Sequence, residues 1–328
     1  MPRSFYLLSF SIPTSIGIAF YLKGIFAYLP VFYSFLFLPA LELILKENAQ
    51  NLDSQEELLK KNDFFYDLIL WAMVPIQLSL FFYFLFLMST DLDLISRIGI
   101  ILSMGLGCGV LGINVAHELG HRNNSFEQGL AKLLLSTSLY WHFFIEHNKG
   151  HHKNVSTPLD PESSRLNESL YHFWGRSIID SFRSAWKIDR REMIKALLFQ
   201  LFGLGLILYY FNSLTLLCFL CSALFGILLL ESVNYIEHYG LVRREITPGK
   251  YEKVLVKHSW NANHPLSRAI LFDLSRHSDH HAYINRKYQL LRHHDDSPQL
   301  PTGYPGMILL SLIPPLWFRI MNRKLKEL

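Results

Sequence analysis

Apolar residues gather along this chain into long runs that carry few charges. Six of these runs approach the roughly 20 residues that an α-helix needs to cross a lipid bilayer. They cover residues 4–21, 25–45, 64–88, 94–116, 196–211 and 214–236. A very apolar soluble helical protein is the alternative, but a soluble core does not require repeated runs of this length. The pattern therefore predicts an all-α integral membrane protein with six transmembrane helices, in which residues 1–328 form a single domain.

The placement of lysine and arginine predicts how these helices are oriented. If the N-terminus lies in the cytoplasm, only Lys23 and Arg97 fall on the outer side, and the other 29 of the 31 basic residues are cytoplasmic. The first run lacks an Ala-x-Ala-like cleavage site, so we interpret it as a retained helix. We therefore expect a multi-pass protein of the inner membrane with both termini in the cytoplasm. No basic stripe lies among exposed aromatic residues, so the formal charge of +4 does not indicate nucleic-acid binding.

Histidine is concentrated in the segments on the predicted cytoplasmic side. Nine of the fifteen histidines form four short clusters, namely His117 and His121; His147, His151 and His152; His238; and His277, His280 and His281. Neutral imidazole is the commonest protein ligand of transition metals, and nine ligands are too many for one ion and about right for two. Residues spaced i, i+4 share a face of a helix. We therefore expect a cytoplasmic histidine-rich cap that holds two metal ions.

An acidic residue stands beside a histidine in each cluster, at Glu118, Glu146, Glu237 and Asp279. Two divalent ions bring four positive charges that neutral imidazoles do not cancel. A carboxylate that accepts the far ring N–H of a ligand orients that ligand and offsets this charge. We assign the four acids to this outer layer, with direct binding or bridging of a metal by one of them as the alternative.

Glu231 and Asn234 lie about two turns and one turn before His238 in the sixth run. An ionisable group at membrane depth is expected to be functional. We therefore predict that Glu231 and Asn234 take part in catalysis, with Glu231 delivering protons or supporting a ligand. A structural hydrogen bond to a neighbouring helix is the alternative.

Other interpretations of the histidines explain fewer of them. The stretch from His117 to His121 matches the H-E-x-x-H pattern of zinc proteases, but such an enzyme would use only one further ligand. A membrane metal-binding or transport protein is a non-enzymatic alternative. The histidines outside the clusters are expected to be structural or to lie on the surface, and they are His142, His172, His258, His264, His293 and His294.

Iron is the metal that we expect. Nitrogen ligands suit zinc, copper, iron and nickel alike, so the spacing does not choose among them. An apolar interior suits an apolar substrate, however, and activating a C–H bond requires a redox metal and oxygen. Zinc has no redox chemistry.

Longer stretches around the clusters resemble the AlkB-type alkane 1-monooxygenases of the membrane fatty acid desaturase and hydroxylase superfamily. The most specific stretch runs from Asn234 to Leu241 and reads Asn-Tyr-Ile-Glu-His-Tyr-Gly-Leu. Acyl desaturases share the looser histidine boxes but not this stretch. Matching motifs also occur at residues 117–122, 146–152, 276–282 and 291–306, so the similarity covers nearly the whole chain.

The resemblance implies terminal hydroxylation of n-alkanes to 1-alkanols at a non-haem di-iron centre of two iron ions (Fe2+/Fe3+), with O2 as co-substrate. It implies that the nine clustered histidines are the ligands. It also implies electrons from a rubredoxin, which an NAD(P)H-dependent reductase reduces. The chain has no pair of C-x-x-C knuckles, so we expect a separate rubredoxin. An acyl-lipid desaturase or hydroxylase on the same scaffold is the alternative.

One departure from the family pattern lies close to the second cluster. The family commonly has Thr-Pro-Glu-Asp-Pro there, whereas this chain has Leu159 in place of the glutamate, followed by Asp160. The departure removes one acid from the outer layer of the site. Asp160 is retained, and we expect it to support a metal ligand.

Overall fold

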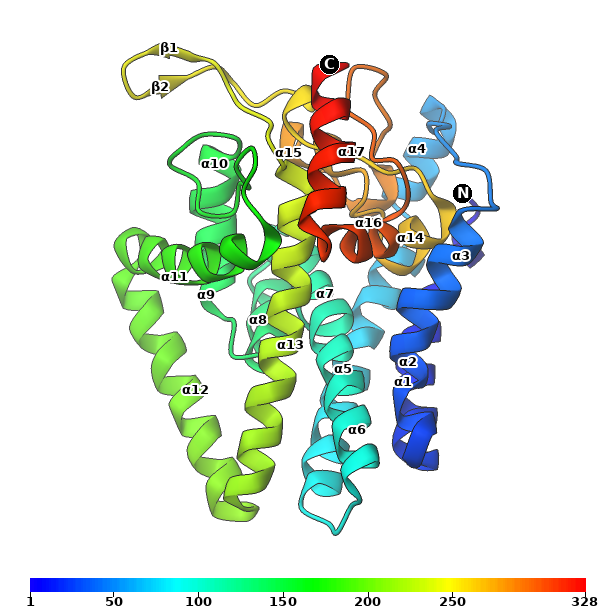
Figure 1. Cartoon of the computed structure of the whole chain (residues 1–328), viewed down its shortest axis with the longest axis vertical. Helices are drawn as coiled ribbons and strands as arrows, with labels where there is room; N and C mark the ends of the chain where they lie inside the picture. The colour runs from blue at the N-terminus through cyan, green and yellow to red at the C-terminus, as the bar shows by residue number, and fades with distance from the viewer. The chain divides into compact units, whose positions relative to one another are not determined.

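The computed structural model describes residues 1–328, and nearly all of its regular structure is helical (Figure 1). Six helical stretches are long and apolar enough to cross a membrane, which confirms the predicted number. They are Arg3–Leu22, Gly24–Glu42, Phe65–Met88, Leu94–Gly120, Arg190–Tyr210 and Ser213–His238. The fifth begins ahead of its apolar run, because the Asp189 side chain accepts a hydrogen bond from the Glu192 backbone N–H and caps a polar first turn. The fourth continues past its run and includes His117.

The chain divides into two compact units whose segments alternate along the sequence. Unit 1 comprises residues 1–37, 64–144 and 189–230, and unit 2 comprises residues 38–63, 145–188 and 231–328. Helix α13 (Ser213–His238) contributes its first part to unit 1 and its last part, from Glu231 onward, to unit 2. That the whole chain acts as a single domain remains a prediction.

Unit 1 contains most of the membrane-spanning residues. Apart from its part of α13, its elements are η1 (Arg3–Phe10), α1 (Ser11–Leu22), η2 (Gly24–Tyr28), α2 (Leu29–Phe32), η3 (Tyr33–Phe37), α5 (Phe65–Met88), α6 (Leu94–Gly107), η4 (Cys108–Asn114), α7 (Val115–Gly120), α8 (Ser125–Ser136) and α12 (Arg190–Tyr210); α9 (His142–Glu146) starts in this unit. Segments η3 and η4 are π-helical.

Helices α6 and α13 approach closely at two glycines of unit 1. A Cβ atom added to Gly105 would lie 2.6 Å from the ring of Phe225, and one added to Gly226 would lie 2.6 Å from the Cβ of Cys108. Small residues let helix backbones pack tightly in a membrane, where dispersion contacts replace the hydrophobic effect as the main attraction. The glycines are therefore required by this helix crossing.

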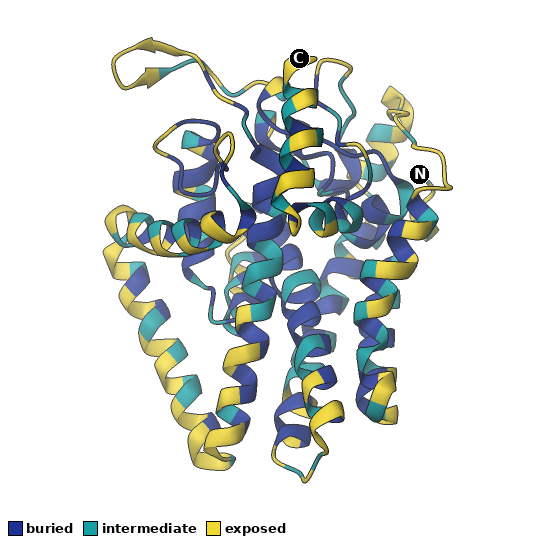
Figure 2. Cartoon of the chain, viewed as in Figure 1, coloured by how far each residue is buried: buried dark blue, intermediate teal, exposed yellow.

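Apolar side chains also cover the outside of the spanning helices. In α12, Leu201, Phe202 and Tyr209 are 62%, 65% and 80% exposed, and Figure 2 shows exposed residues along most of this helix. Large exposed apolar surfaces are unfavourable in water but match the hydrocarbon tails of lipids. The residues of α12 are therefore suited to contact with lipid.

Unit 2 contains most of the polar segments. Its elements are α3 (Leu38–Glu42), α4 (Ser54–Lys61), η5 (His147–His151), α10 (His152–Asn154), α11 (Leu170–Ile188), β1 (Glu245–Thr247), β2 (Lys250–Tyr251), η6 (Val256–His258), α14 (Pro265–Ile270), α15 (His277–Ala282), η7 (Tyr288–Leu290), α16 (Tyr304–Ser311) and α17 (Pro314–Lys326). Strands β1 and β2 form an antiparallel pair.

An aromatic core supports the end of α13 in unit 2. Tyr235, Tyr239, Trp260 and Trp317 are all at most 1% exposed and belong to one buried cluster. The Trp260 indole N–H donates to the backbone carbonyl of Tyr239 at 2.9 Å, so its polar atom is satisfied inside the core. This packing fixes the helix end from which His238 projects.

Candidate metal centre

Four histidine rings in unit 2 direct their Nε2 atoms toward one another. They are His151 in η5, His238 in α13, and His277 and His281 in α15. The Nε2 atoms are separated by 3.2 Å between His151 and His281, 2.9 Å between His281 and His277, and 3.1 Å between His277 and His238. All four side chains are buried, and their ligand nitrogens lie within 4.8 Å of one another. We refer to these residues as the four-histidine group.

The spacing in the four-histidine group matches a shared metal ion. A metal–imidazole bond of about 2.1 Å places neighbouring nitrogens roughly 3.0 Å apart at a right angle and roughly 3.4 Å apart at a tetrahedral angle. Hydrogen bonds alone explain the arrangement less well. The Nε2 atoms of His277 and His281 each face two other Nε2 atoms, whereas a neutral ring carries only one N–H. The donor set is therefore suited to a transition metal.

The remaining predicted ligands belong to both units. In unit 2, His152 Nε2 lies 3.0 Å from His147 Nε2 and 3.2 Å from His280 Nε2. In unit 1, the Nε2 atoms of His117 and His121 face each other at 3.4 Å. Seven of the nine predicted ligands thus belong to unit 2 and two belong to unit 1. Their role as metal ligands remains a prediction.

The backbone of η5 decides how the histidines of the second cluster pair. From the sequence spacing, His147 and His151 are expected to share a helix face. The two rings do stack, with centroids 5.1 Å apart and planes at 26°. Segment η5 is nevertheless a π-helix, in which residues five positions apart lie one above the other. His147 is therefore in contact with His152, and the Nε2 atom of His151 turns toward the four-histidine group. Single π-helical turns of this kind are frequent at functional sites.

Helix α15 is only six residues long and is held in place by surrounding side chains. Asn261 accepts a hydrogen bond from the backbone N–H of Ser278 at 2.8 Å and donates one to the Ser278 hydroxyl at 2.7 Å. Arg276, just before the helix, donates to backbone carbonyls of two neighbouring loops at 2.7 Å and 2.9 Å. These bonds fix the orientation of the three histidines that the helix contains.

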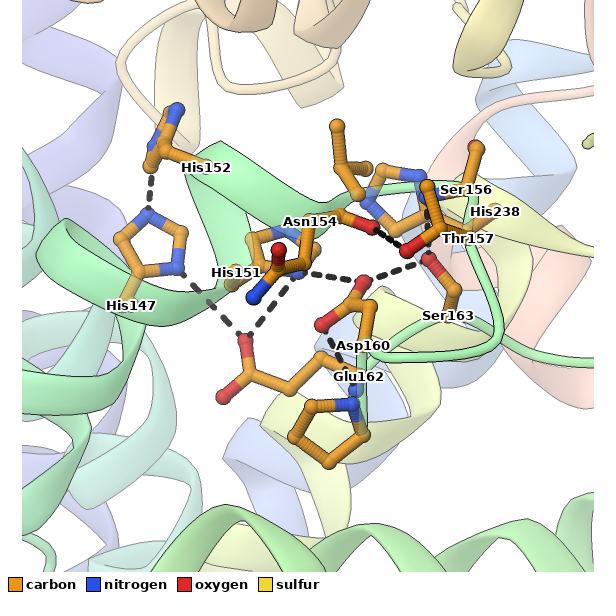
Figure 3. A network of polar contacts seen from close by, with 12 residues as sticks. His147, His151, His152, Asn154, Ser156, Thr157, Asp160, Glu162, Ser163 and His238 are labelled. Carbon is orange, nitrogen blue, oxygen red and sulfur yellow. Dashed lines mark hydrogen bonds and ion pairs between the residues drawn. The ribbon is translucent and has the colours of Figure 1, made fainter. Parts of the chain in front are cut away.

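Two buried carboxylates stand behind the rings of His147 and His151 (Figure 3). Asp160 Oδ2 accepts a hydrogen bond from His151 Nδ1 at 2.9 Å, which leaves the Nε2 lone pair available to a metal. Glu162 Oε2 lies 3.6 Å from His147 Nδ1 and 3.7 Å from His151 Nδ1. Asp160 thus contacts a predicted ligand, and its role in supporting a metal site remains a prediction. Glu162 was missed, and its only sequence signal is an acid two residues after Asp160.

Burial and neighbouring charges shift the pKa values of these groups. Burial raises the pKa of Glu162 well above its usual range, and the carboxylate of Glu231 adds to the effect. Although burial opposes both shifts, the contact between Asp160 and His151 lowers the pKa of Asp160 and raises the pKa of His151. Burial and the neighbouring histidine rings lower the pKa of His281 well below its usual range. His281 is thereby kept in the neutral form that binds metals.

Glu237 does not lie behind a ligand ring, where we expected it. Its Oε2 atom lies 3.2 Å from Nε2 of His277, which is the nitrogen that faces the other rings. Its Oε1 atom accepts a hydrogen bond from the Tyr304 hydroxyl at 2.6 Å. The carboxylate is therefore placed to bind a metal directly, which is the alternative that the sequence left open.

The other acids beside the histidines have partners outside the ligand rings. Glu118 forms an ion pair of 2.8 Å with Arg122, one turn further along the chain. Glu146 accepts a hydrogen bond of 3.2 Å from a serine hydroxyl of α11. Asp279 accepts hydrogen bonds from an arginine at 2.7 Å and from His294 Nε2 at 2.6 Å. These contacts neutralise or anchor the acids, and support of the ligands by them remains a prediction.

Glu231 and Asn234 are buried in unit 2, at 0% and 3% exposure. The charge of Glu231 adds to the effect of burial in raising the pKa of Glu162. A catalytic role for Glu231 and Asn234 remains a prediction. Among the histidines outside the clusters, His142 is buried in unit 1, and burial lowers its pKa to about 4.

Comparison with known proteins identifies relatives of the chain. Residues 94–311 match the fatty acid desaturase family. Alkane 1-monooxygenase 2 of Pseudomonas aeruginosa is 40% identical over 307 residues, which cover 88% of this chain and 81% of that protein. The alkane 1-monooxygenase of Acinetobacter baylyi is 36% identical over 321 residues, covering 93% and 78%. The xylene/toluene monooxygenase hydroxylase component of Pseudomonas putida is 28% identical over 287 residues, covering 82% and 76%.

Proposed function

This chain belongs to the alkane 1-monooxygenases within the fatty acid desaturase family and is an oxidoreductase, and on this basis we propose that it hydroxylates n-alkanes at the terminal methyl group. One oxygen atom of O2 enters the 1-alkanol product, and the other leaves as water after uptake of two electrons and two protons. The main structural observation in support is the four-histidine group, whose buried Nε2 atoms converge at the spacing of metal ligands.

The proposed cofactor is a pair of iron ions (Fe2+/Fe3+) held by the nine clustered histidines, with one iron in the four-histidine group. Bound iron would supply the redox chemistry that O2 activation requires and that zinc lacks. The proposed ligands are His117, His121, His147, His151, His152, His238, His277, His280 and His281.

Carboxylates around the rings would orient the ligands and balance their charge. Asp160 holds His151 by its Nδ1–H, so that the ring presents Nε2 in a fixed direction. Glu237 places a carboxylate oxygen next to His277 Nε2, where it would offset the positive charge of a bound metal. We assign proton delivery to Glu231 and Asn234, because both are buried polar groups in the helix that ends at His238.

The proposed substrate reaches the enzyme from the lipid bilayer, in which n-alkanes dissolve. Internal C–H bonds of an alkane are weaker than terminal ones, so terminal attack requires that only the chain end is positioned at the oxidising site. The six apolar helices support a membrane location. We place the protein in the inner membrane with both termini in the cytoplasm, as the distribution of basic residues predicts.

The proposed electron donor is a separate rubredoxin, reduced by an NAD(P)H-dependent reductase. A one-electron donor would have to act twice for each alkanol. The donor would approach the enzyme from the cytoplasm, where NAD(P)H is available.

A second candidate is an acyl-lipid desaturase or hydroxylase. The match to the fatty acid desaturase family over residues 94–311 supports this candidate, since that family includes enzymes acting on acyl chains. The two functions differ in their products. A desaturase yields an alkene without an added oxygen, and an acyl-lipid hydroxylase leaves free alkanes unchanged.

The test combines metal analysis with product analysis. The purified protein is assayed for iron and then incubated with rubredoxin, reductase, NADH and n-alkanes of several lengths. We expect two irons per chain and 1-alkanol that contains one 18O atom when 18O2 is supplied. A protein with two irons that forms no 1-alkanol would contradict the main proposal, and unsaturated acyl products would favour the second candidate.

A further inference from the structure

Tyr304, the first residue of α16, is buried in unit 2 beside Glu237. Its hydroxyl donates a hydrogen bond of 2.6 Å to Oε1 of Glu237, a residue 67 positions earlier in the chain. The other carboxylate oxygen, Oε2, lies 3.2 Å from Nε2 of His277. The tyrosine hydroxyl and the nitrogen of a proposed ligand therefore contact the two different oxygens of one carboxylate.

The position of Glu237 Oε2 fits a ligand of the same metal ion that His277 binds. Metal–oxygen bonds of a carboxylate and metal–nitrogen bonds of a histidine are both about 2.1 Å long. Two such ligands at roughly 90–110° to each other are about 3.0–3.4 Å apart, and the separation here is 3.2 Å. This oxygen would bring a negative charge to a centre whose other proposed ligands are neutral rings.

The hydrogen bond from Tyr304 decides how the carboxylate is presented. A carboxylate can bind a metal through one oxygen or through both. Because Oε1 of Glu237 accepts the tyrosine hydroxyl, Oε2 is the oxygen that faces His277 Nε2. Binding through one oxygen uses one coordination position fewer, and catalytic metal sites keep a position open. A hydrogen bond that orients a metal-binding carboxylate is a common outer-layer interaction.

Packing on two sides fixes Tyr304 in turn. Its side chain is 0% exposed and belongs to the buried aromatic cluster that also contains Trp317. The preceding residue, Gly303, lies so close to Glu42 of α3 that a Cβ atom at Gly303 would overlap the Glu42 carboxylate. Glu42 is itself buried, and its Oε1 atom accepts a hydrogen bond of 2.7 Å from the backbone N–H of Ser267. The start of α16, and with it the tyrosine, is therefore held in one position.

We propose that Tyr304 is a positioning residue of the metal centre, and that its hydroxyl holds Glu237 so that one carboxylate oxygen is presented as a ligand to the iron bound by His277. The inference rests on the proposed function and adds a carboxylate to its nine histidine ligands. Tyr304 acts on the iron through Glu237. Removing the hydroxyl should therefore change the environment of one iron and leave that of the other unchanged.

The test compares two variants that each lose one buried hydroxyl. Tyr304→Phe keeps the ring in the core and abolishes the hydrogen bond to Glu237. The control is Tyr235→Phe, because the Tyr235 side chain is equally buried and its hydroxyl donates a bond of 2.7 Å to the backbone carbonyl of Glu168. Each protein is titrated with Fe2+ under anaerobic conditions, and bound iron is followed by Mössbauer spectroscopy.

We expect Tyr304→Phe to bind one of its two irons about tenfold more weakly than wild type. The quadrupole splitting of that iron should change, because its carboxylate is no longer held in one orientation. Tyr235→Phe should match wild type in both measurements. Wild-type affinity and spectra in Tyr304→Phe, or equal changes in the control, would overturn the inference.

A double variant tests whether Tyr304 acts through Glu237. Glu237→Gln keeps the shape of the side chain and removes its charge, so it should weaken binding of the same iron. Adding Tyr304→Phe to Glu237→Gln should cause little further loss, because the hydroxyl then has no carboxylate to orient. Residues that act as a unit show such non-additive effects. Additive losses in the double variant would mean that Tyr304 acts independently of Glu237 and would overturn the inference.

The two proposals fail in distinguishable ways, because the iron titrations require no turnover. If wild-type enzyme with two irons bound forms no 1-alkanol, the proposed function fails. If wild-type enzyme forms 1-alkanol but Tyr304→Phe keeps the wild-type iron affinity and spectra, only the role of Tyr304 fails.

Discussion

The substitution Asp160→Asn tests whether the structure behind the histidines determines metal binding. In the native protein, Asp160 Oδ2 accepts from His151 Nδ1 at 2.9 Å and from the Ser163 hydroxyl at 2.5 Å. Its Oδ1 atom accepts from the backbone N–H of Glu162 at 3.2 Å. Asparagine has nearly the same shape, but it is neutral and one of its two terminal groups is a donor.

The magnitude follows from these three bonds. If the asparagine oxygen stays toward His151 and Ser163, its NH2 group faces the Glu162 N–H, and two donors oppose each other. The flipped amide would instead direct NH2 at the His151 N–H. Either way one buried bond is lost, at a cost of about 1–3 kcal/mol. Loss of a carboxylate behind a metal ligand costs roughly 10–100-fold in metal affinity, or about 1.4–2.7 kcal/mol, which agrees.

The assay measures iron directly. Wild type, Asp160→Asn and the control Asp180→Asn are titrated with Fe2+ under anaerobic conditions, and bound iron is followed by Mössbauer spectroscopy. Asp180 is an exposed residue of α11 that pairs with Arg183. We expect one iron to bind roughly 10–100-fold more weakly in Asp160→Asn and alkanol formation to fall with it, whereas the control binds two irons normally.

The reasoning would be refuted by an Asp160→Asn protein that binds two irons with wild-type affinity and wild-type spectra. Equal losses in Asp160→Asn and Asp180→Asn would also refute it, because an exposed surface pair contributes little. A drop in activity alone, with iron binding intact, would show that Asp160 acts after the metal is bound.

Three further predictions concern the ligands, the helix packing and pH. Replacing His281 by alanine should lower bound iron from two to about one per chain, whereas replacing His172, which is 71% exposed, should leave both irons bound; equal iron content would contradict the ligand set. Gly226→Leu should destabilise the protein by about 1–3 kcal/mol in detergent melting experiments. Gly203→Leu should leave the stability unchanged, because a Cβ atom at Gly203 meets nothing within 4 Å. An equal loss of stability in both variants would argue against the helix crossing. The raised pKa of His151 stabilises the metal-free protein at low pH, and this stabilisation is lost as the pH rises through that pKa. Iron must displace this proton, so iron retained after dialysis should increase as the pH rises through the same range, and the opposite trend would contradict the role of His151.

The membrane helices were predictable because a long apolar run is a local property of the sequence. An apolar run of that length is unstable in water and must be buried in a membrane or in a very large core. The six runs therefore correspond to six helices. Their ends were less predictable. The start of the fifth helix at Arg190 depends on the Asp189 cap, whose hydrogen bond adds a polar turn that hydropathy does not detect.

The clusters of histidines were likewise visible in the sequence, because ligands on one helix turn lie close together in the chain. The pairing of the rings was not. His147 contacts His152, and His151 joins the four-histidine group, because η5 is π-helical. The i, i+4 spacing of the histidines does not reveal the π-helical turn, because that turn depends on the hydrogen bonds of the backbone.

The sequence by itself determined the number of apolar helices, the candidate ligands and the resemblance to alkane 1-monooxygenases. Each of these depends on residue type and short-range spacing. Tertiary structure alone decided that Glu162 stands behind two histidines, that Glu237 faces the metal side of His277, and that His294 reaches Asp279. Some of these contacts join residues from separate segments. In the others, the packing around a side chain sets its direction. The orientation of a side chain is set by its neighbours in space, and the order of residues does not specify it.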